Sequence, residues 1–171
     1  PVIASQSAAT TARLVEGDDT ALYAADLWCG GAVGGATSKL IEALGWMARE
    51  RVPVINISLV GPDNPVLARA VAAMITRGHV LVSAVGNDGP AAPPLFPAMY
   101  AGVIGVAGVD AKDRVLPESG RGEQVDFSAS GMLRDGQGVL RGTSFAAPVV
   151  ARRAAQLVQD LHPDATGRVH R

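Results

Sequence analysis

A serine at the start of an apolar segment is the residue of this chain best placed for covalent chemistry. Residues 142–148 read Gly-Thr-Ser-Phe-Ala-Ala-Pro and run directly into an apolar segment that ends at Leu161. Thr143 or Ser144 is predicted to cap a helix, with Pro148 so early in it that its missing N–H removes no intrahelical bond. Unpaired N–H groups at such a helix start stabilise negative charge, which suits a nucleophile that attacks a carbonyl. The same spacing also fits a helix start and nothing more.

An asparagine is the second candidate for chemistry. Gly86 and Asn87 directly follow the apolar run 80–85. In an open parallel α/β sheet, sites lie at the carboxyl ends of the strands, so the Asn87 amide is predicted to donate a hydrogen bond beside Ser144. The alternative interpretation is an ordinary turn, because Asn-Asp-Gly at 87–89 is a common turn sequence.

The elements that must position these side chains alternate between apolar runs and amphipathic segments. Strands are predicted at 22–28, 54–59, 80–85, 103–109 and 125–128, and a hairpin at 132–140. Helices are predicted at 4–15, from a cap at Thr37 or Ser38 to residues 50–51, from residue 66 to a stop at Gly78, and from Ser144 to near His162. This alternation predicts an α/β fold with a mostly parallel sheet and helices on both faces.

The composition excludes several classes of protein. The chain has 171 residues, which suits a single domain, and a formal net charge of −1, which gives no reason to expect nucleic acid or an anionic membrane as a partner. Its longest apolar run, residues 101–109, is too short to span a membrane. Cys29 is the single cysteine, so no internal disulfide can form, and a structural thiol is expected.

The motifs around the two candidates are similar to those of the subtilisin-like serine proteases, peptidase family S8. Gly142-Thr143-Ser144-x-Ala146-x-Pro148 resembles the motif of the family's nucleophile, and Ala84-x-Gly86-Asn87 resembles that of its oxyanion-hole asparagine. The resemblance extends from Ala21 to the helix after Ser144. It implies a three-layer subtilisin-like fold and a serine-type endopeptidase that forms an acyl-enzyme on Ser144, with Asn87 in the oxyanion hole.

A third stretch, residues 55–62, resembles the family's substrate-binding strand. The resemblance implies that an extended peptide pairs with the backbone of three residues, Ser58, Leu59 and Val60. It also implies that Gly86 leaves room for the substrate side chain before the scissile bond. Relatives often have two glycines after the leucine, whereas this chain has Val60 followed by Gly61.

The rest of the expected catalytic triad is not visible in the sequence. Subtilisin-like enzymes carry Asp, His and Ser in that order, and neither the family's Asp-x-Gly stretch nor its His-Gly-Thr stretch occurs here. His79 is predicted at the opposite edge of the sheet, His162 about 27 Å along the helix from Ser144, and His170 in the tail. We therefore expect residues 1–171 to be a single partial domain, the C-terminal portion of a catalytic domain, with its N-terminal part missing. The catalytic Asp and His would come from an upstream segment or another chain, and the fragment alone would be inactive.

The remaining expectations concern partners and location. No cofactor is evident and no carboxylates cluster with metal-ligand spacing, so structural calcium is implied by the resemblance alone; Asp63 and Asn64 are interpreted as a polar turn. The resemblance implies polypeptide substrates and a secreted or cell-envelope location, although Pro1 opens no signal-peptide pattern. The composition suggests a bacterial source, and the tail 164–171 is expected to fray.

Two other functions fit parts of the sequence. The first is a non-catalytic peptide-binding relic of the subtilisin fold, which would use the Ser58–Val60 edge without turnover. The second is an α/β-hydrolase esterase, because residues 142–146 approximate a nucleophile elbow. That fold needs Asp and His after the serine, and few residues follow Ser144 here.

Overall fold

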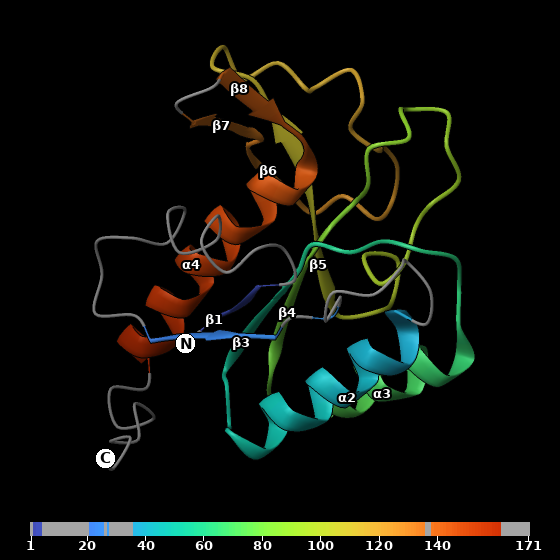
Figure 1. Ribbon diagram of the computed structural model, residues 1–171, viewed down its shortest axis with the longest axis vertical. Coiled ribbons are helices and arrows are strands. Elements are labelled where there is room, and N and C mark those ends of the chain that lie inside the picture. Colours follow the sequence, from blue (N-terminus) through green and yellow to red (C-terminus); the bar gives the residue numbers. More distant parts are fainter. Residues whose placement is uncertain (1, 5–20, 26, 28–35, 136–137, 162–171) are drawn as a thin grey trace.

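The computed structural model describes residues 2–4, 21–25, 27, 36–135 and 138–161 (Figure 1). Several predictions lie outside these residues: the helix expected over most of 4–15, the environment of Cys29, His162 and His170, and the tail 164–171. Among the described residues, no helix combines the length and apolarity needed to cross a membrane.

A six-stranded parallel sheet forms the middle of the molecule, with the strand order β2-β1-β3-β4-β5-β6. The strands are β1 Val2–Ala4, β2 Leu22–Ala24, β3 Val54–Ile57, β4 Val80–Ala84, β5 Val103–Val109 and β6 Phe127–Ser130. A separate antiparallel pair, β7 Met132–Asp135 and β8 Gly138–Arg141, is the predicted hairpin. The parallel sheet predicted from the sequence is therefore confirmed.

The strand predictions differ from the structure mainly at the ends. The run 103–109 is β5 as predicted, whereas β2 ends at Ala24 rather than at residue 28, and β6 lies two residues later than predicted. Strand β1 was not predicted, and it places Ala4 at a strand end instead of a helix start.

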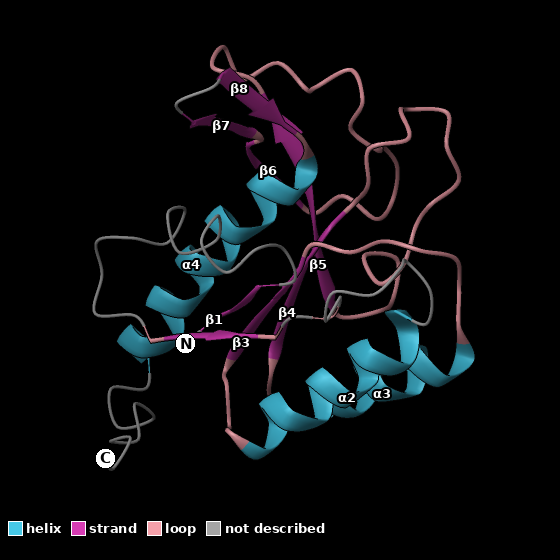
Figure 2. Cartoon of the chain, viewed as in Figure 1, coloured by secondary structure: helices cyan, strands magenta, loops and turns pink. Residues whose placement is uncertain are grey.

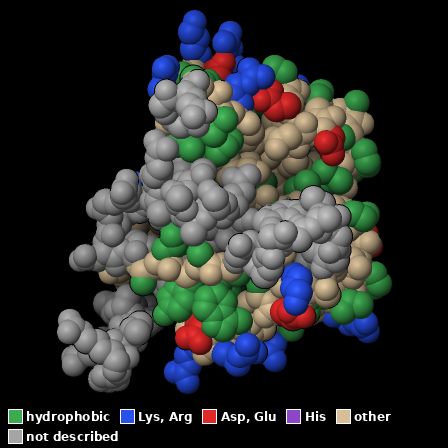
Figure 3. Space-filling view, in the orientation of Figure 1, with side chains coloured by type: hydrophobic (Ala, Val, Ile, Leu, Met, Phe, Trp, Pro, Cys, Tyr) green, Lys and Arg blue, Asp and Glu red, His purple; other side chains and the backbone are tan. Residues whose placement is uncertain are grey.

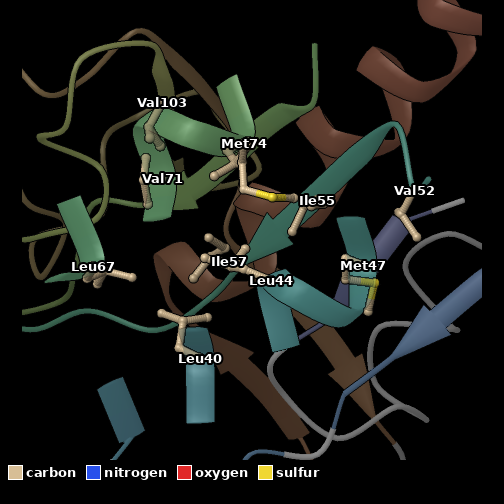
Figure 4. Packing of buried hydrophobic residues seen from close by; sticks show 11 residues of the cluster. Leu40, Leu44, Met47, Val52, Ile55, Ile57, Leu67, Val71, Met74 and Val103 are labelled. Atoms are coloured by element: carbon tan, nitrogen blue, oxygen red, sulfur yellow. The ribbon is translucent and has the colours of Figure 1, made fainter. Parts of the chain in front are cut away.

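In the described part of the chain, three helices cover the two faces of the sheet (Figure 2). They are α2 Ala36–Arg49, α3 Pro65–Thr76 and α4 Thr143–Leu161. Successive side chains of a strand point to opposite faces, so Ile55 and Ile57 pack with α2 and α3, whereas Val54 packs with α4. Figure 4 shows Leu44 of α2, Ile55 of β3 and Met74 of α3 in the core layer between the sheet and these two helices. The three-layer α/β architecture matches the expectation.

The residues that begin the helices were predicted less well. Helix α2 begins at Ala36, so Thr37 and Ser38 lie inside its first turn and neither is its cap. Asn64, interpreted as part of a polar turn, caps α3: its Oδ1 accepts hydrogen bonds from the N–H groups of Val66 and Leu67, each at 3.0 Å. Helix α4 begins at Thr143, one residue before Ser144.

Charged side chains of both signs are mixed over the face shown in Figure 3, mostly near its upper and lower margins. The ion pairs seen in the described part of the chain are local, such as Lys39 with Glu42 on α2, or join a strand to a loop, as Arg141 at the end of β8 does with Glu118. This pattern accords with the net charge of −1.

Candidate functional site

The carboxyl ends of β3 and β4 meet the start of α4 at one edge of the sheet. Because Ile57 pairs with Ser83, the residues that follow these two strands emerge side by side. The Ser58 hydroxyl donates a hydrogen bond to the Ser144 carbonyl at 3.3 Å. The Thr143 N–H donates to Asn87 Oδ1 at 2.9 Å. The structure thus brings together Ser58, Asn87 and Ser144, which are far apart in the sequence.

The Asn87 amide is oriented by its contacts with Thr143. Its Oδ1 accepts the backbone N–H of Thr143 and also the Thr143 hydroxyl, at 3.2 Å. A backbone N–H can only donate, so this contact fixes Oδ1 toward Thr143 and leaves the two Nδ2 hydrogens as the remaining donors. Asn87 also accepts a hydrogen bond from a backbone N–H in the first turn of α4. The sequence had predicted that Thr143 or Ser144 would cap this helix. A methyl group on Gly142 would make only ordinary contact with this amide, at 3.4 Å, so the glycine is favoured by its φ of +150°.

The carbonyl of Ser144 is left without its usual helical partner. Pro148 is the sixth residue of α4, and the N–H that it lacks would have bonded to the carbonyl four residues earlier, that of Ser144. The prediction that Pro148 removes no intrahelical bond is therefore wrong. Ser58 supplies the replacement donor, and the Ser58 hydroxyl in turn accepts a hydrogen bond from Asn56 Nδ2 at 3.0 Å.

The two side chains of this network, those of Asn56 and Ser58, are buried. Asn56 is 1% exposed and Ser58 is 7% exposed. Within the described residues, Asn56 Oδ1 has no hydrogen-bond partner. Buried polar contacts of this kind rigidify the groups that they join, so we expect the backbone of Ser144 to be held firmly.

A loop after β5 fixes the segment that carries Asn87. The Gly120 N–H donates to the Gly86 carbonyl at 3.0 Å, and the Gly89 N–H donates to the Glu118 carbonyl at 2.9 Å. The Glu118 carboxylate also pairs with Arg141, through Nε at 3.1 Å and Nη2 at 3.3 Å. Arg141 ends β8, directly before the Gly142-Thr143-Ser144 turn. Sequence analysis missed this clamp, because charges so far apart in the chain give no local signal.

Gly86, which the resemblance implies leaves room for a substrate side chain, lies two residues after the end of β4 and adjoins Leu95. Its φ of +99° is a conformation that glycine adopts readily and that side-chain-bearing residues rarely adopt. A methyl group on Gly86 would lie 2.7 Å from Leu95 Cδ1 and 3.8 Å from Val60 Cγ1. Leu95 was not predicted to belong to the site, because it arrives from a loop with no motif of its own.

The one histidine among the described residues lies at the opposite ends of the strands from Ser144. His79 precedes β4, and its Nδ1 lies 2.7 Å from the Val52 carbonyl, at the amino ends of the strands, as predicted. Burial raises the pKa of the Tyr100 phenol, and the hydrogen-bonded Arg114 lowers the pKa of Asp110 to about 2. In the described part of the chain, no three His, Cys, Asp or Glu residues are grouped to hold a metal ion.

Comparisons with known proteins agree on one family. A family model described as "Subtilase family" (Peptidase_S8) matches residues 16–171. The minor extracellular protease Epr of Bacillus subtilis (strain 168) is 33% identical over 132 residues, which are 73% of this chain and 20% of Epr.

Solved structures give the same result. A cold-adapted subtilisin-like serine proteinase has 30% sequence identity and a TM-score of 0.70, over 81% of this chain and 53% of that one. A lanthipeptide protease matches with a TM-score of 0.77 at 20% identity, over 95% and 62% of the two chains, which shows the fold alone. The chain therefore spans less than two thirds of the length of each relative named here.

Proposed function

The chain belongs to the subtilase family, and from this premise we propose that it carries the nucleophile and one oxyanion donor of a serine endopeptidase. The observation that carries the proposal is the orientation of Asn87: Thr143 holds Oδ1, so that Nδ2 is the end of the amide left to donate beside Ser144. The family membership disfavours the α/β-hydrolase alternative, which belongs to an unrelated fold.

In the proposed reaction, Ser144 Oγ attacks the carbonyl carbon of the scissile peptide bond. The serine proton passes to a base, and the carbonyl oxygen becomes an oxyanion that accepts a hydrogen bond from Asn87 Nδ2. The C–N bond then breaks as the proton moves to the leaving amine, which leaves an acyl group on Ser144. Water hydrolyses this ester and regenerates the hydroxyl.

Polypeptides are the proposed substrates. Ser58, Leu59 and Val60 follow the last ladder pair of β3 with β4, and an extended peptide is proposed to pair with their backbone. The buried Ser58 side chain supports this role for the segment, because it ties the substrate strand to the backbone of the nucleophile.

The base and the carboxylate that orients it are proposed to come from outside the described residues, from an upstream segment or another chain. His79, at the opposite edge of the sheet, does not supply the base. Without a base, Ser144 keeps its proton, and this chain alone would be inactive. The same proposal includes a partial catalytic domain over residues 1–171 and structural calcium. It also includes a location outside the cell, which is supported by the word "extracellular" in the name of Epr.

Labelling with a fluorophosphonate, read by intact mass, tests this function. It would be applied to this chain alone and to the chain extended upstream of Pro1 by a segment that carries Asp and His, with Ser144→Ala as the control for the site of attachment. We expect labelling of the extended chain only, and none in Ser144→Ala. No labelling of either form would overturn the proposal in favour of a non-catalytic peptide-binding module.

A further inference from the structure

Glu118 contacts two segments of the candidate site at once. Its backbone carbonyl accepts the Gly89 N–H at 2.9 Å, two residues after Asn87. Its carboxylate forms a forked pair with the guanidinium of Arg141, through Oε1 and Nε at 3.1 Å and through Oε2 and Nη2 at 3.3 Å. Arg141 lies two residues before Thr143. One loop residue therefore joins the segment of the proposed oxyanion donor to the segment of the proposed nucleophile.

These contacts close a ring. The Thr143 N–H donates to Asn87 Oδ1 at 2.9 Å, and the chain continues from Asn87 to Gly89. From Gly89 the ring passes through Glu118 to Arg141, and the chain then leads back to Thr143. The separation of Asn87 and Thr143 is thus constrained twice, by their direct hydrogen bond and by the path through Glu118.

The loop that carries Glu118 is anchored on β5 by its own contacts. Leu116 is 1% exposed, and its N–H donates to the Gly108 carbonyl at 2.9 Å. Ser119 is fully buried, and its Oγ accepts the Gly108 N–H at 3.3 Å. Because Glu118 lies between these two buried residues, its backbone has a fixed position that does not depend on Arg141.

Asn87, by contrast, is exposed, so packing does not hold its side chain. Its orientation depends on the bonds to Thr143, which is fully buried, and on the position of the backbone that carries it. We propose that Glu118, acting through Arg141, is a positioning residue that keeps the Asn87 amide in place beside Ser144. The inference rests on the proposed function, in which Asn87 Nδ2 donates to the oxyanion.

The exposure of the ion pair limits the size of this effect. The side chain of Arg141 is 52% exposed and that of Glu118 is 24% exposed. An ion pair can shift a conformational equilibrium by no more than its own free-energy contribution, which for exposed pairs corresponds to a factor of up to about five. We therefore expect the pair to raise the population of the positioned amide by about two- to fivefold and to change the stability of the whole chain little.

Hydrogen exchange of the Thr143 amide tests the positioning role without requiring turnover. Glu118→Gln keeps the shape of the side chain and removes its charge, and NMR on the full chain would follow the exchange rate of the Thr143 N–H. At low ionic strength we expect exchange about two- to fivefold faster in the variant, with a Tm lowered by less than about 4 °C. In 1 M NaCl, where the Debye length is about 3 Å, the two rates should converge.

Glu42→Gln is the matched control, because it removes the exposed ion pair of Glu42 with Lys39 on α2, on the other face of the sheet from α4. The Gly61 N–H, which bonds to the Phe96 carbonyl at 2.9 Å, is the reference amide and should exchange equally in every variant. The positioning role is overturned if Thr143 exchanges equally in the parent chain and Glu118→Gln, or if faster exchange also appears at Gly61 or in Glu42→Gln.

A double-mutant cycle tests whether Glu118 acts through Arg141. Arg141→Gln should reproduce the faster exchange of Glu118→Gln, and the double variant should show no further increase. Additive increases would show that the two residues act independently and would also overturn the inference.

Kinetics of the extended chain connect the ion pair to catalysis. There, Glu118→Gln should lower kcat by about two- to fivefold at low ionic strength and leave KM within about twofold, because the oxyanion forms only after substrate has bound. Fluorophosphonate labelling of the extended chain reports separately on the proposed function. Faster Thr143 exchange without labelling would refute the protease and leave the coupling through Glu118 intact, whereas labelling with unchanged exchange would refute only the positioning role.

Discussion

At the scale of single residues, we propose two separable functions for the Asn87 carboxamide. Its oxygen accepts two hydrogen bonds from Thr143 and so satisfies the start of α4, while its nitrogen is the proposed oxyanion donor. In this proposal the oxygen contributes to stability and the nitrogen to catalysis. Substitutions that change only one end of the side chain can distinguish the two.

Asn87→Asp keeps an oxygen that accepts from Thr143 but removes the Nδ2 donor and adds a negative charge beside the oxyanion. In the extended, active chain we expect kcat to fall by at least about 10²–10³-fold, the loss known for removal of one oxyanion donor in subtilisin, a member of this family. Steady-state kinetics would measure kcat and KM, and thermal unfolding should change little. A kcat within tenfold of the parent value would contradict this role for Asn87.

Asn87→Ala provides the comparison, because it removes the acceptor as well as the donor. We expect a similar loss of kcat together with a loss of about 0.5–2 kcal/mol of unfolding free energy, the usual cost of losing a helix cap. Equal stability of the Asp and Ala variants would show that the contact with Thr143 contributes nothing to folding.

At the scale of elements, Pro148 and Ser58 form a pair across α4 and the segment after β3. Ser58→Ala leaves the Ser144 carbonyl without its donor and Asn56 Nδ2 without its acceptor, so we expect a loss of about 1–3 kcal/mol of unfolding free energy. Pro148→Ala restores an N–H four residues after Ser144. In that background the cost of Ser58→Ala should fall to less than half, as measured by urea unfolding in a double-mutant cycle. Strictly additive losses would show that the two residues do not share this carbonyl.

The start of α3 should respond to alkaline pH through Tyr100. The Tyr100 hydroxyl bonds to Asp63 and to the backbone of Asn64, the residue that caps the helix, and burial raises the pKa of the phenol above its usual 10.0. A raised pKa means that the fold favours the protonated phenol, so the stabilisation is complete below pH 10 and is lost as the pH rises through the raised value. We expect the unfolding free energy to fall more steeply above pH 10 in the parent chain than in Tyr100→Phe. Parallel curves for the two proteins would contradict this coupling.

Periodicity predicted the long elements of this fold and missed the contacts between them. The runs that became β3, β4, β5 and α3 are predictable because burial imposes its pattern on consecutive residues. The predicted start of α4 was wrong because the first N–H of the helix, that of Thr143, is bonded by Asn87 Oδ1. Asn87 lies 56 residues earlier in the sequence, so no local pattern indicates this contact. Strand β1 was missed because it has three residues, too few to show a period of hydrophobicity. Leu95 was missed because it lies in a loop whose path depends on the pairing of Gly61 with Phe96.

The candidate site was predictable in part, through motifs. Three separate stretches of sequence predicted Ser58, Asn87 and Ser144 as site residues. In the structure, Ser58 contacts the backbone of Ser144, and Asn87 contacts Thr143, the residue before Ser144. The Glu118–Arg141 clamp and the Asn56–Ser58 bond carried no sequence signal. Both depend on which loops pack together, which is decided by the tertiary fold.

At the scale of the whole molecule, the two core layers are built from side chains of different size. The layer under α4 contains four buried alanines of that helix, so that α4 lies close against the sheet; they are Ala146, Ala147, Ala151 and Ala155. The layer under α2 and α3 contains large side chains such as Leu44 and Met47. Because Ser144 lies in the first turn of α4, the small-residue layer determines where the proposed nucleophile lies.

Substitutions in the two layers should therefore have different consequences for the site. Met47→Ala leaves a cavity under α2 and should cost about 2–5 kcal/mol of unfolding free energy, with the labelling rate of Ser144 unchanged in folded, extended chain. Ala151→Leu overpacks the other layer and should cost about 1–3 kcal/mol while also slowing the labelling, because α4 must shift. Urea unfolding and labelling kinetics on the same samples measure both effects. An unchanged labelling rate in Ala151→Leu would contradict the argument.

The position of β1 has a consequence for the order in which the chain can fold during synthesis. Strand β1 pairs with β2 on one side and β3 on the other, and both neighbours leave the ribosome after it. In the described sheet β2 pairs with β1 alone, and parallel partners cannot close by a simple hairpin. This edge of the sheet is therefore completed only once β3 has emerged, and a nascent chain arrested before Val54 would hold β1 without the neighbour that joins it to the core.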